Sequence, residues 1–404
     1  MTTPGGRAPG VEARVADPVS CVLGDGLAGL RRHVLGAVVP ALDKLLADVA
    51  EEGELPPVLE RLAADPVSLL DGRDAPGDLG IRHATVAVEA LATGRQTYLI
   101  PVLVNALARA PIVLAGNDAQ QERFLARAAT RPVGTFAMTE PEAGSDVARL
   151  ATTARDDGDH VVLNGHKCWI NVLDREALEW IIVWARPEGS TGHALSCFVV
   201  PADTPGVHIA QVGDMLGMRA IPLADIRLEE VRVPRTHQIG EDGRCFGLAM
   251  RCLNSVRSVV GARGLGLTAR VLMDAADYVN ARPSFGGTLA DRQSVRATLA
   301  ALAARLEAAR LLTYRAAALA DARDLGKEAS PVHAASKWLG TELAVEAATA
   351  AMHLAGAAGY DESRTMFARH LRDAQQLTIV EGVSEVQLEL IGYGVLDGSL
   401  WWER

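Results

Sequence analysis

Aromatic residues, apolar runs of membrane length and basic clusters are scarce or missing in this chain. Aromatic residues fill 4% of its 404 positions, and the formal net charge is −10. No run approaches the roughly 18 apolar residues that a membrane-spanning helix needs, and the N-terminus lacks the basic start and apolar core of a secretion signal. We therefore expect a cytoplasmic protein that binds neither a membrane nor nucleic acid.

Signals for disulfide bonds and metal sites are also missing. The five cysteines, Cys21, Cys168, Cys197, Cys245 and Cys252, form an odd set without a CxxC or Cys/His metal spacing. We expect them to be reduced and mostly structural, and we predict no metal site. Cys168 is interpreted as a packing residue rather than a nucleophile.

What is present is a helical pattern, then a β-rich one, then a second helical one. A chain of this length predicts two or three packed units. Residues 1–20 are expected to form a flexible leader, 21–133 a helical domain, 134–245 a β domain and 246–404 a bundle of four antiparallel helices. The fold class is therefore mainly α with a middle β domain.

Local patterns support this division. Short β-rich runs after Pro132 are separated by turn signals such as DDGD and ADTPG, a spacing that indicates a small antiparallel barrel or sandwich. Before it, a helix is predicted with Asn117 or Asp118 as its cap. After it, one predicted helix carries Leu299, Leu302, Leu306 and Leu312 on one side.

One glycine motif resembles a dinucleotide-binding fingerprint but does not have its context. In GARGLGLTA, residues Gly264, Gly266 and Ala269 fit the dinucleotide fingerprint G-x-G-x-x-A. That fingerprint must follow a strand, whereas this segment lies within a long helical pattern. We interpret the glycines as sites of close helix packing.

A more informative turn lies in FAMTEPEAGSDVARL, Phe136 to Leu150. Its small residues gather backbone N–H groups and hydroxyls with little bulk, which suits a flat polar ring or a phosphate. Glu140 and Glu142 in this turn are interpreted as surface or cap groups. Farther on, NGHKCWIN places Trp169 at a predicted strand end, where an indole can form the wall of an aromatic site.

The stretch TIVEGVSEVQ, Thr378 to Gln387, sets Glu381 behind an apolar β-branched pair and before a glycine. A lone glutamate of this kind is usually a solvated helix residue. Desolvation by an apolar wall would instead raise its pKa and make it a stronger base.

Five motifs in this order and spacing resemble the acyl-CoA dehydrogenase family: TEPEAGSD, LNGHKCWI, LGMRA with EEVRVP, NARPSFGGTL, and RHLRDAQQLTIVEGVSEVQ. The similarity runs from about Gly80 onward. It implies an N-terminal helical domain, a central β-barrel and a C-terminal four-helix bundle. It also implies FAD as the cofactor.

The resemblance assigns residues to that flavin. Phe136 to Ser145 would lie along the ring, including Met138 and Gly144, with Thr139 hydrogen-bonding it and Ser145 near both flavin and substrate. Trp169 would wall the ring, and Asn171 takes the position beside flavin N5. Val383 and Glu385 would also approach FAD.

Other implied contacts come from a neighbouring subunit. Arg282, Ser284, Gln293, His353 and Gly356 resemble residues that reach the pyrophosphate and adenosine of a neighbour's FAD. A homodimer or a homotetramer follows.

Glu381 falls where most of the family keeps its catalytic base. A positioned carboxylate must remove the weakly acidic Cα proton of an acyl thioester while hydride leaves Cβ for flavin N5. The family's other position for the base holds Ser255 here. Asn254, Arg257 and Gly382, together with Ser145, are the expected substrate contacts.

Several positions depart from the family pattern. Asn171 replaces a usual Thr or Ser, Val380 an aromatic, Val383 a hydroxyl residue and His353 a frequent Gln, and Asn254 stands for a frequent Asp. These departures indicate a divergent branch with an unusual acyl group, a carrier-protein thioester in place of acyl-CoA, or weakened FAD binding.

The leading hypothesis is an FAD-dependent acyl-thioester dehydrogenase that passes electrons to an electron-transferring flavoprotein. Two alternatives stay open: a flavin oxidase or monooxygenase on the same fold, and a non-catalytic thioester-binding relative.

Overall fold

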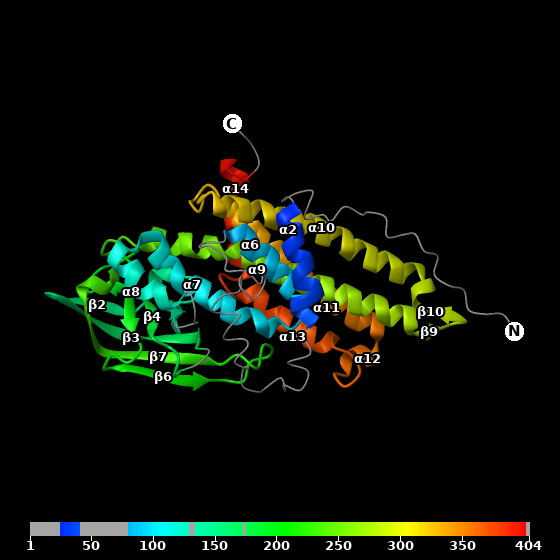
Figure 1. Ribbon diagram of the computed structural model, residues 1–404, viewed down its shortest axis with the longest axis horizontal. Helices are drawn as coiled ribbons and strands as arrows, with labels where there is room; N and C mark the ends of the chain where they lie inside the picture. The colour runs from blue at the N-terminus through cyan, green and yellow to red at the C-terminus, as the bar shows by residue number, and fades with distance from the viewer. Residues whose placement is uncertain (1–24, 41–79, 129–133, 173–174, 401–404) are drawn as a thin grey trace.

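The structure, a computed structural model, describes residues 25–40, 80–128, 134–172 and 175–400 (Figure 1). The predicted leader, residues 1–20, lies outside them. Helices precede the sheet and long helices follow it, so the mainly α fold class with a middle β domain is confirmed. We propose domain boundaries near residues 133 and 245, where these element types change. No helix in the described part of the chain is long and apolar enough to cross a membrane.

The helices before the sheet are short. Within residues 25–40 and 80–128 they are α2 (Asp25–His33), the π-helical turn η1 (Val34–Val38), α6 (Ile81–Leu91), η2 (Gln96–Leu99), α7 (Ile100–Ala115) and α8 (Asp118–Ala128). Asn117 caps α8: its side-chain oxygen accepts the backbone N–H of Gln120 at 2.9 Å, and Gln120 Oε1 accepts that of Asn117 at 2.9 Å. Of the two predicted caps, Asn117 is the one used.

Eight strands form the middle sheet. They are β1 (Gly134–Ala137), β2 (Thr153–Asp157), β3 (His160–Asn171), β4 (Trp180–Pro187), β5 (Ser196–Pro201), β6 (Val207–Val212), β7 (Leu223–Pro234) and β8 (Gln238–Ile239). Their order is β6-β7-β3-β2-β4-β5-β8, with β1 on β4. The sequence predicts an antiparallel barrel or sandwich, and most strand pairs are antiparallel, but β1 and β2 both pair with β4 in parallel. Turn signals mark where strands end and cannot specify which strands pair.

Strand β4 explains where the core sits. Trp180, Ile182 and Trp184 pack toward α7, α8 and α9, while Ile181 and Val183 pack toward β3 and β7 inside the sheet. Successive side chains of a strand point to opposite faces, so an unbroken apolar run is buried on both.

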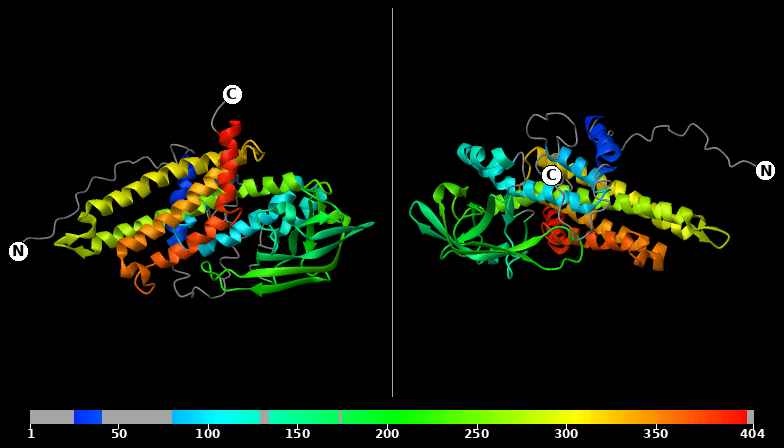
Figure 2. Two further views of the ribbon diagram at one scale, coloured as in Figure 1. Left: turned by 180° about the vertical axis from the view of Figure 1, so that it is seen from behind. Right: turned by 60° about the horizontal axis from the view of Figure 1, so that its bottom comes forward.

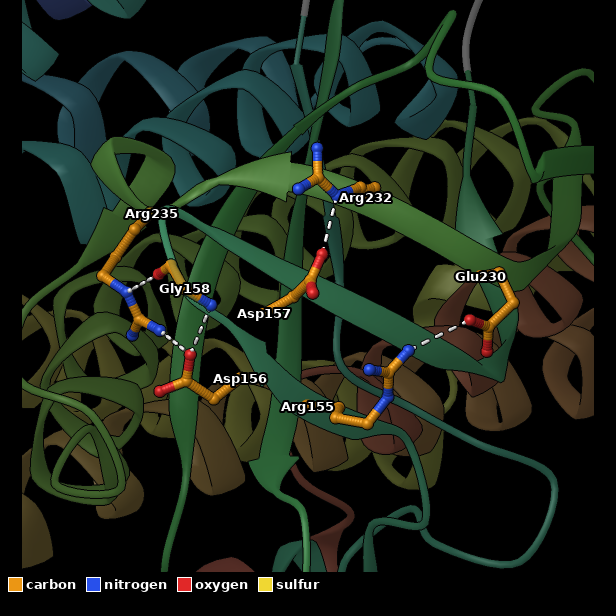
Figure 3. A network of polar contacts seen from close by, with 7 residues as sticks. All are labelled: Arg155, Asp156, Asp157, Gly158, Glu230, Arg232 and Arg235. Carbon is orange, nitrogen blue, oxygen red and sulfur yellow. Dashed lines mark hydrogen bonds and ion pairs between the residues drawn. The ribbon is translucent and has the colours of Figure 1, made fainter.

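Exposed ion pairs join the strands at the outer end of the sheet (Figure 3). Arg232 meets Asp157 at 2.7 Å, Arg235 meets Asp156 at 2.5 Å, and Arg155 of β2 meets Glu230 of β7 at 3.2 Å. Because these pairs are solvated, each contributes little to stability.

The second helical region contains long helices. They are α9 (Phe246–Ala281), α10 (Gln293–Asp321), α11 (Ser330–Ala355), α12 (Ala357–Tyr360), α13 (Phe367–Ile379) and α14 (Ser384–Asp397), with the hairpin β9 (Pro283–Ser284) and β10 (Gly287–Thr288) and the 3-10 turn η5 (Leu289–Asp291) between α9 and α10. Leu302 and Leu306 face the bundle core, but Leu312 packs toward Val332 and Leu400 in a separate cluster. The four leucines that the sequence places on one side of this helix therefore divide between two hydrophobic clusters.

The long helices run from the sheet at one end to the hairpin β9/β10 and α12 at the other (Figures 1 and 2). A loop from the sheet also reaches the bundle. A Cβ on Gly217 would lie 2.5 Å from the backbone oxygen of Arg372, and the Met218 backbone N–H donates to Asp373 Oδ1 at 2.8 Å. This loop fixes the sheet against α13.

Glycines set the crossing of α9 and α11. A Cβ on Gly264 would lie 2.1 Å from the Gly340 carbonyl oxygen, and one on Gly340 would lie 2.6 Å from that of Gly261. Gly264 lies inside α9, far from any strand end. The interpretation of GARGLGLTA as a close-packing motif is confirmed.

Gly264→Ala is expected to lower the free energy of unfolding by about 1–3 kcal/mol, because the added methyl forces two helix backbones apart. Gly247→Ala on the same helix is the matched control, since a Cβ there meets nothing within 4 Å. Chemical denaturation of both variants measures the difference. Equal stability of the two would contradict the close-packing argument.

Candidate active site

The turn after β1 is held by a buried ion pair. Lys167 Nζ donates to Glu140 Oε1 at 2.7 Å and to the Met138 carbonyl at 3.1 Å. Glu140 also accepts the backbone N–H groups of Ala151 at 2.6 Å and Thr152 at 3.0 Å. The interpretation of Glu140 as a surface or cap group is wrong, whereas Glu142 is exposed.

This pair changes both pKa values. Burial pushes the pKa of Glu140 upward, but Lys167 and the donated hydrogen bonds outweigh it, so that the pKa lies below its ordinary value. Burial lowers the pKa of Lys167 to about 8, against the opposing pull of Glu140. Each of these two residues therefore favours the charged form of the other.

Trp169 stands out in backbone and side chain. Its φ is +53°, and 56% of the residue is exposed. It lies where the pairing of β3 with β7 shifts register between Lys167 and Ile170. A left-handed backbone is costly for a non-glycine residue and persists where the surroundings enforce it, often at functional sites.

The bulge and the turn are joined directly, because the Cys168 N–H donates to the Thr139 carbonyl at 3.0 Å. Gly144 and Ser145 are exposed, Phe136, Thr139 and Asn171 are half-buried, and Met138 is buried. The structure thus brings together the segments that the sequence predicted to share one flat ligand. The Cys168 thiol is buried, and its pKa is raised to about 11, which fits a packing role.

Glu381 lies in the turn between α13 and α14 and not within a helix. Its φ is +51°, and Gly382 follows with a φ of +98°. Gln387 fixes these two residues, because its Nε2 donates to the Gly382 carbonyl at 2.9 Å and to the Glu381 carbonyl at 3.4 Å. The carboxylate is therefore aimed by the backbone of a constrained turn.

The carboxylate of Glu381 is buried although the residue is partly exposed. Its Oε2 has no hydrogen-bond partner in the described structure. Burial raises the pKa of Glu381, which is the direction predicted from the sequence, while Arg263, Lys337 and Arg257 oppose the rise.

The surroundings of Glu381 differ from the expected apolar wall. Ile379 is 60% exposed, so its side chain does not form a buried wall beside Glu381. Arg257 and Arg263 of α9 and Lys337 of α11 are buried instead. The prediction of an apolar setting is wrong, because helices distant in sequence supply a cationic one.

Asn254 and Arg257 hold each other and the loop before α11. Arg257 Nη1 donates to Asn254 Oδ1 at 2.6 Å, and Asn254 Nδ2 donates to the Leu325 carbonyl at 2.9 Å. The helix that carries them begins at Phe246, so Arg257 is not at its start. Arg257 also comes close to Gly382, since its Nη2 lies 3.9 Å from where a Cβ of that glycine would be.

A cavity of about 300 Å³ lies between α11, α13 and the start of α14. Val383 and Glu385 line it, together with Ile379. Glu385 is exposed and lies in the first turn of α14, so it is not one helical turn from Glu381 on a shared helix.

The remaining predicted ligand contacts lie elsewhere. Ser284, Arg282 and Gln293 surround the hairpin β9/β10, and His353 and Gly356 end α11. The Tyr278 hydroxyl donates to the Ala355 carbonyl at 3.2 Å and joins these segments. They lie at the end of the bundle opposite the sheet (Figure 1), so one chain does not gather them beside Trp169.

Sequence reasoning missed Lys167, Arg263, Lys337 and Gln387. Each is a polar side chain that is buried in the folded chain. Gln387 could have been predicted from the sequence, because it lies six residues after Glu381 in the same motif. Burial of the three cations could not be predicted from neighbouring residues, since the groups that they contact lie in other segments of the chain.

Comparisons with known proteins agree with this arrangement. Residues 135–231 match the family description "Acyl-CoA dehydrogenase, middle domain", and residues 243–396 match "Acyl-CoA dehydrogenase, C-terminal domain". The short-chain specific acyl-CoA dehydrogenase of Bos taurus mitochondria is 36% identical over 308 residues, which are 75% of this chain and 73% of the bovine protein.

Solved structures show the same similarity. Butyryl-CoA dehydrogenase from Megasphaera elsdenii is 28% identical with a TM-score of 0.79, over 95% of this chain and 99% of that chain. A glutaryl-CoA dehydrogenase from Mycobacterium smegmatis in complex with FADH2 is 25% identical with a TM-score of 0.77, over 93% of this chain and 95% of that chain.

Proposed function

Because the chain belongs to the acyl-CoA dehydrogenase family and is an FAD-dependent oxidoreductase acting on CH–CH groups, we propose that Glu381 abstracts the Cα proton of an acyl thioester. The product would be the α,β-unsaturated thioester. The observation that carries the proposal is the buried, unpartnered Oε2 of a carboxylate whose pKa is raised by burial. A base with these properties takes up a proton more readily than a solvated glutamate.

The residues present fit FAD. The exposed indole of Trp169 offers a flat face beside the open turn at Gly144 and Ser145, and Val383 and Glu385 line a cavity between α11, α13 and the start of α14. Bound FAD supplies an acceptor for the hydride that leaves Cβ. We propose that Thr139, Ser145, Trp169 and Asn171 hold the ring.

The backbone of the same turn can stabilise the developing charge. When the Cα proton leaves, negative charge grows on the thioester oxygen and requires hydrogen-bond donors. The backbone N–H of Glu381 donates to no group among the described residues. We propose that it donates to this oxygen, and that Gly382 permits the thioester to approach because it has no side chain.

Oligomerisation would complete the site. Arg282, Gln293 and His353 are exposed at the far end of the bundle, which supports the proposal that they contact FAD of a neighbouring subunit. Helix α14 projects from the bundle (Figure 2) and exposes apolar side chains, among them Tyr393 at 60% and Leu396 at 81%. We propose a homodimer or homotetramer, an acyl-CoA or acyl-carrier-protein substrate, and an electron-transferring flavoprotein as acceptor.

The visible spectrum of the purified protein tests the proposal. We expect a flavin spectrum that bleaches on anaerobic addition of at least one member of a panel of acyl-CoA and acyl-carrier-protein thioesters. A protein that takes up no added FAD would contradict it. Rapid peroxide formation after bleaching would instead identify an oxidase on the same fold.

Trp169→Ala is expected to weaken FAD binding about two- to tenfold, which corresponds to the loss of one aromatic contact. The variant keeps a Cβ and therefore the same backbone strain, so apo-protein stability should change by less than about 1 kcal/mol. Leu311→Ala is the control, because it truncates a side chain that is 52% exposed on α10. FAD titration followed by flavin fluorescence measures both, and unchanged affinity in Trp169→Ala would remove the indole from the site.

A further inference from the structure

Buried positive charge exceeds buried negative charge at the Glu381 turn. Arg257, Arg263 and Lys337 all interact electrostatically with the single carboxylate of Glu381. Isolated charges are costly to bury, and a fold that keeps them without a bonded counter-ion usually has a use for them.

We infer that Arg263 is a positioning residue for Glu381, which holds the base ionised and fixes the last turn of α13, the helix that leads into the Glu381 turn. The inference rests on the proposed function and assigns a role to a residue outside the predicted site. It also accounts for a buried guanidinium that donates its hydrogen bond to an amide and not to a carboxylate.

The hydrogen bonds of Arg263 support the positioning role. Its Nη2 donates to Gln376 Oε1 at 3.3 Å, and the Gln376 carbonyl accepts the Val380 N–H at 3.1 Å. Gln376 therefore joins Arg263 to the residue that precedes Glu381. Lys337 acts on the same turn, because its Nζ donates to the Thr378 carbonyl at 2.9 Å.

Arg263 itself is not neutralised by a bonded carboxylate. It is 1% exposed, its Nε has no partner in the described structure, and its one hydrogen bond goes to a neutral amide oxygen. Burial lowers the pKa of Arg263 to about 10, still far above neutrality. The residue therefore stays charged at the pH of the reaction.

The charged groups around the turn come from each neighbouring helix. Those that act on Glu381 or on its cations are Arg257 and Arg263 on α9, His333, Lys337 and Glu342 on α11, Asp373 on α13 and Glu385 on α14. Of the three cations that oppose the raised pKa of Glu381, Arg263 has the largest effect, ahead of Lys337 and Arg257. Removing it should affect the base more than removing any other single charge.

The sign of the effect follows directly. A nearby cation favours the ionised carboxylate, so loss of Arg263 raises the pKa of Glu381 further. A smaller fraction of the base is then ionised in the acidic range, while at alkaline pH it is fully ionised in both proteins. Only the acid side of the pH profile should change.

The test compares Arg263→Met with Arg263→Lys, using the acyl-CoA that bleaches the flavin most rapidly. We expect kcat/KM of Arg263→Met to fall about tenfold at pH 6 and to approach the unmodified enzyme at pH 9, because a neighbouring charge typically shifts a carboxyl equilibrium by at least this factor. Arg263→Lys, which keeps the charge, should retain most of the activity at pH 6.

A second measurement does not depend on turnover. Infrared titration of the carboxyl band that disappears in Glu381→Gln should show protonation of Glu381 at higher pH in Arg263→Met than in the unmodified protein. Thermal unfolding checks that the variant is folded at the temperature of the assay. Superimposable pH profiles and titrations would overturn the inference. If Glu381→Gln reduced its flavin at the normal rate, the proposed function would fail independently.

Discussion

Glu381→Gln is expected to keep flavin and to lose about 10²- to 10⁴-fold in the rate of flavin reduction by substrate, the range that a general base contributes. The amide has the shape of the carboxylate but cannot accept the Cα proton. Gly382 in the turn and Gln387 of α14, which holds the turn, are unchanged, so the substrate should still bind. Anaerobic stopped-flow absorbance measures the rate.

The control for this variant is Glu389→Gln, which removes an exposed carboxylate from α14, two turns beyond the site. It should reduce its flavin at the normal rate. Undiminished bleaching in Glu381→Gln would remove the base assignment.

A folding control is also needed, because Glu381→Gln takes away the carboxylate that Arg257, Arg263 and Lys337 face. Glu381→Asp keeps this charge, but its side chain is shorter by one methylene group, so the carboxylate lies farther from the substrate. We expect it to fold like the unmodified protein and to react more slowly, since proton transfer depends on the distance between base and Cα. Normal activity in Glu381→Asp together with normal activity in Glu381→Gln would place the base elsewhere.

The second large effect is expected on stability. Lys167→Met should lower the free energy of unfolding by about 3–5 kcal/mol, because it leaves the buried Glu140 without its cation. FAD affinity should fall as well, since Lys167 also donates to the Met138 carbonyl beside the predicted ring site. Denaturation with and without FAD measures both.

The double variant Glu140→Gln with Lys167→Met separates a lost charge pair from lost packing. With both charges gone no buried ion lacks a partner, so most of the stability should return. Arg155→Met is the exposed counterpart, since Arg155 and Glu230 are 42% and 71% exposed, and it should change stability by less than about 1 kcal/mol. Equal losses in Arg155→Met and Lys167→Met would contradict the assigned difference.

Acid titration gives an independent check. The pKa of Glu140 lies below its ordinary value of 4.5 in the folded protein, so its stabilising contribution is present above that value and is lost as the pH falls through the lowered pKa. Lys167→Met removes the charge that lowers it. The variant should therefore show a weaker loss of stability between neutral and acid pH than the unmodified protein.

Much of the architecture could be predicted from the sequence. Apolar intervals predicted the helices, turn residues divided the strands, and Asn117 marked the start of α8. The glycines of GARGLGLTA were correctly assigned to helix packing by their helical context. These features depend on neighbours within a few residues, which is the range over which backbone propensity and side-chain periodicity act.

The ordered motifs also identified the family and drew attention to Trp169 and Glu381. Both residues have a left-handed backbone, which no pattern in the sequence revealed. The turn at Glu381 depends on Gln387, and the bulge at Trp169 depends on how β3 pairs with β7.

Only the tertiary structure decided which charges lie around these residues. The sequence predicts a surface or cap role for Glu140, whereas in the fold this carboxylate is buried and bonded to Lys167 of β3. The surroundings of Glu381 are cationic and not the expected apolar wall. One of these cations, Arg263, bonds to Gln376, which lies 113 residues farther along the chain. The sequence determined which residue types and elements were available, but packing brought distant side chains together, and their burial set the charge and the pKa of each group.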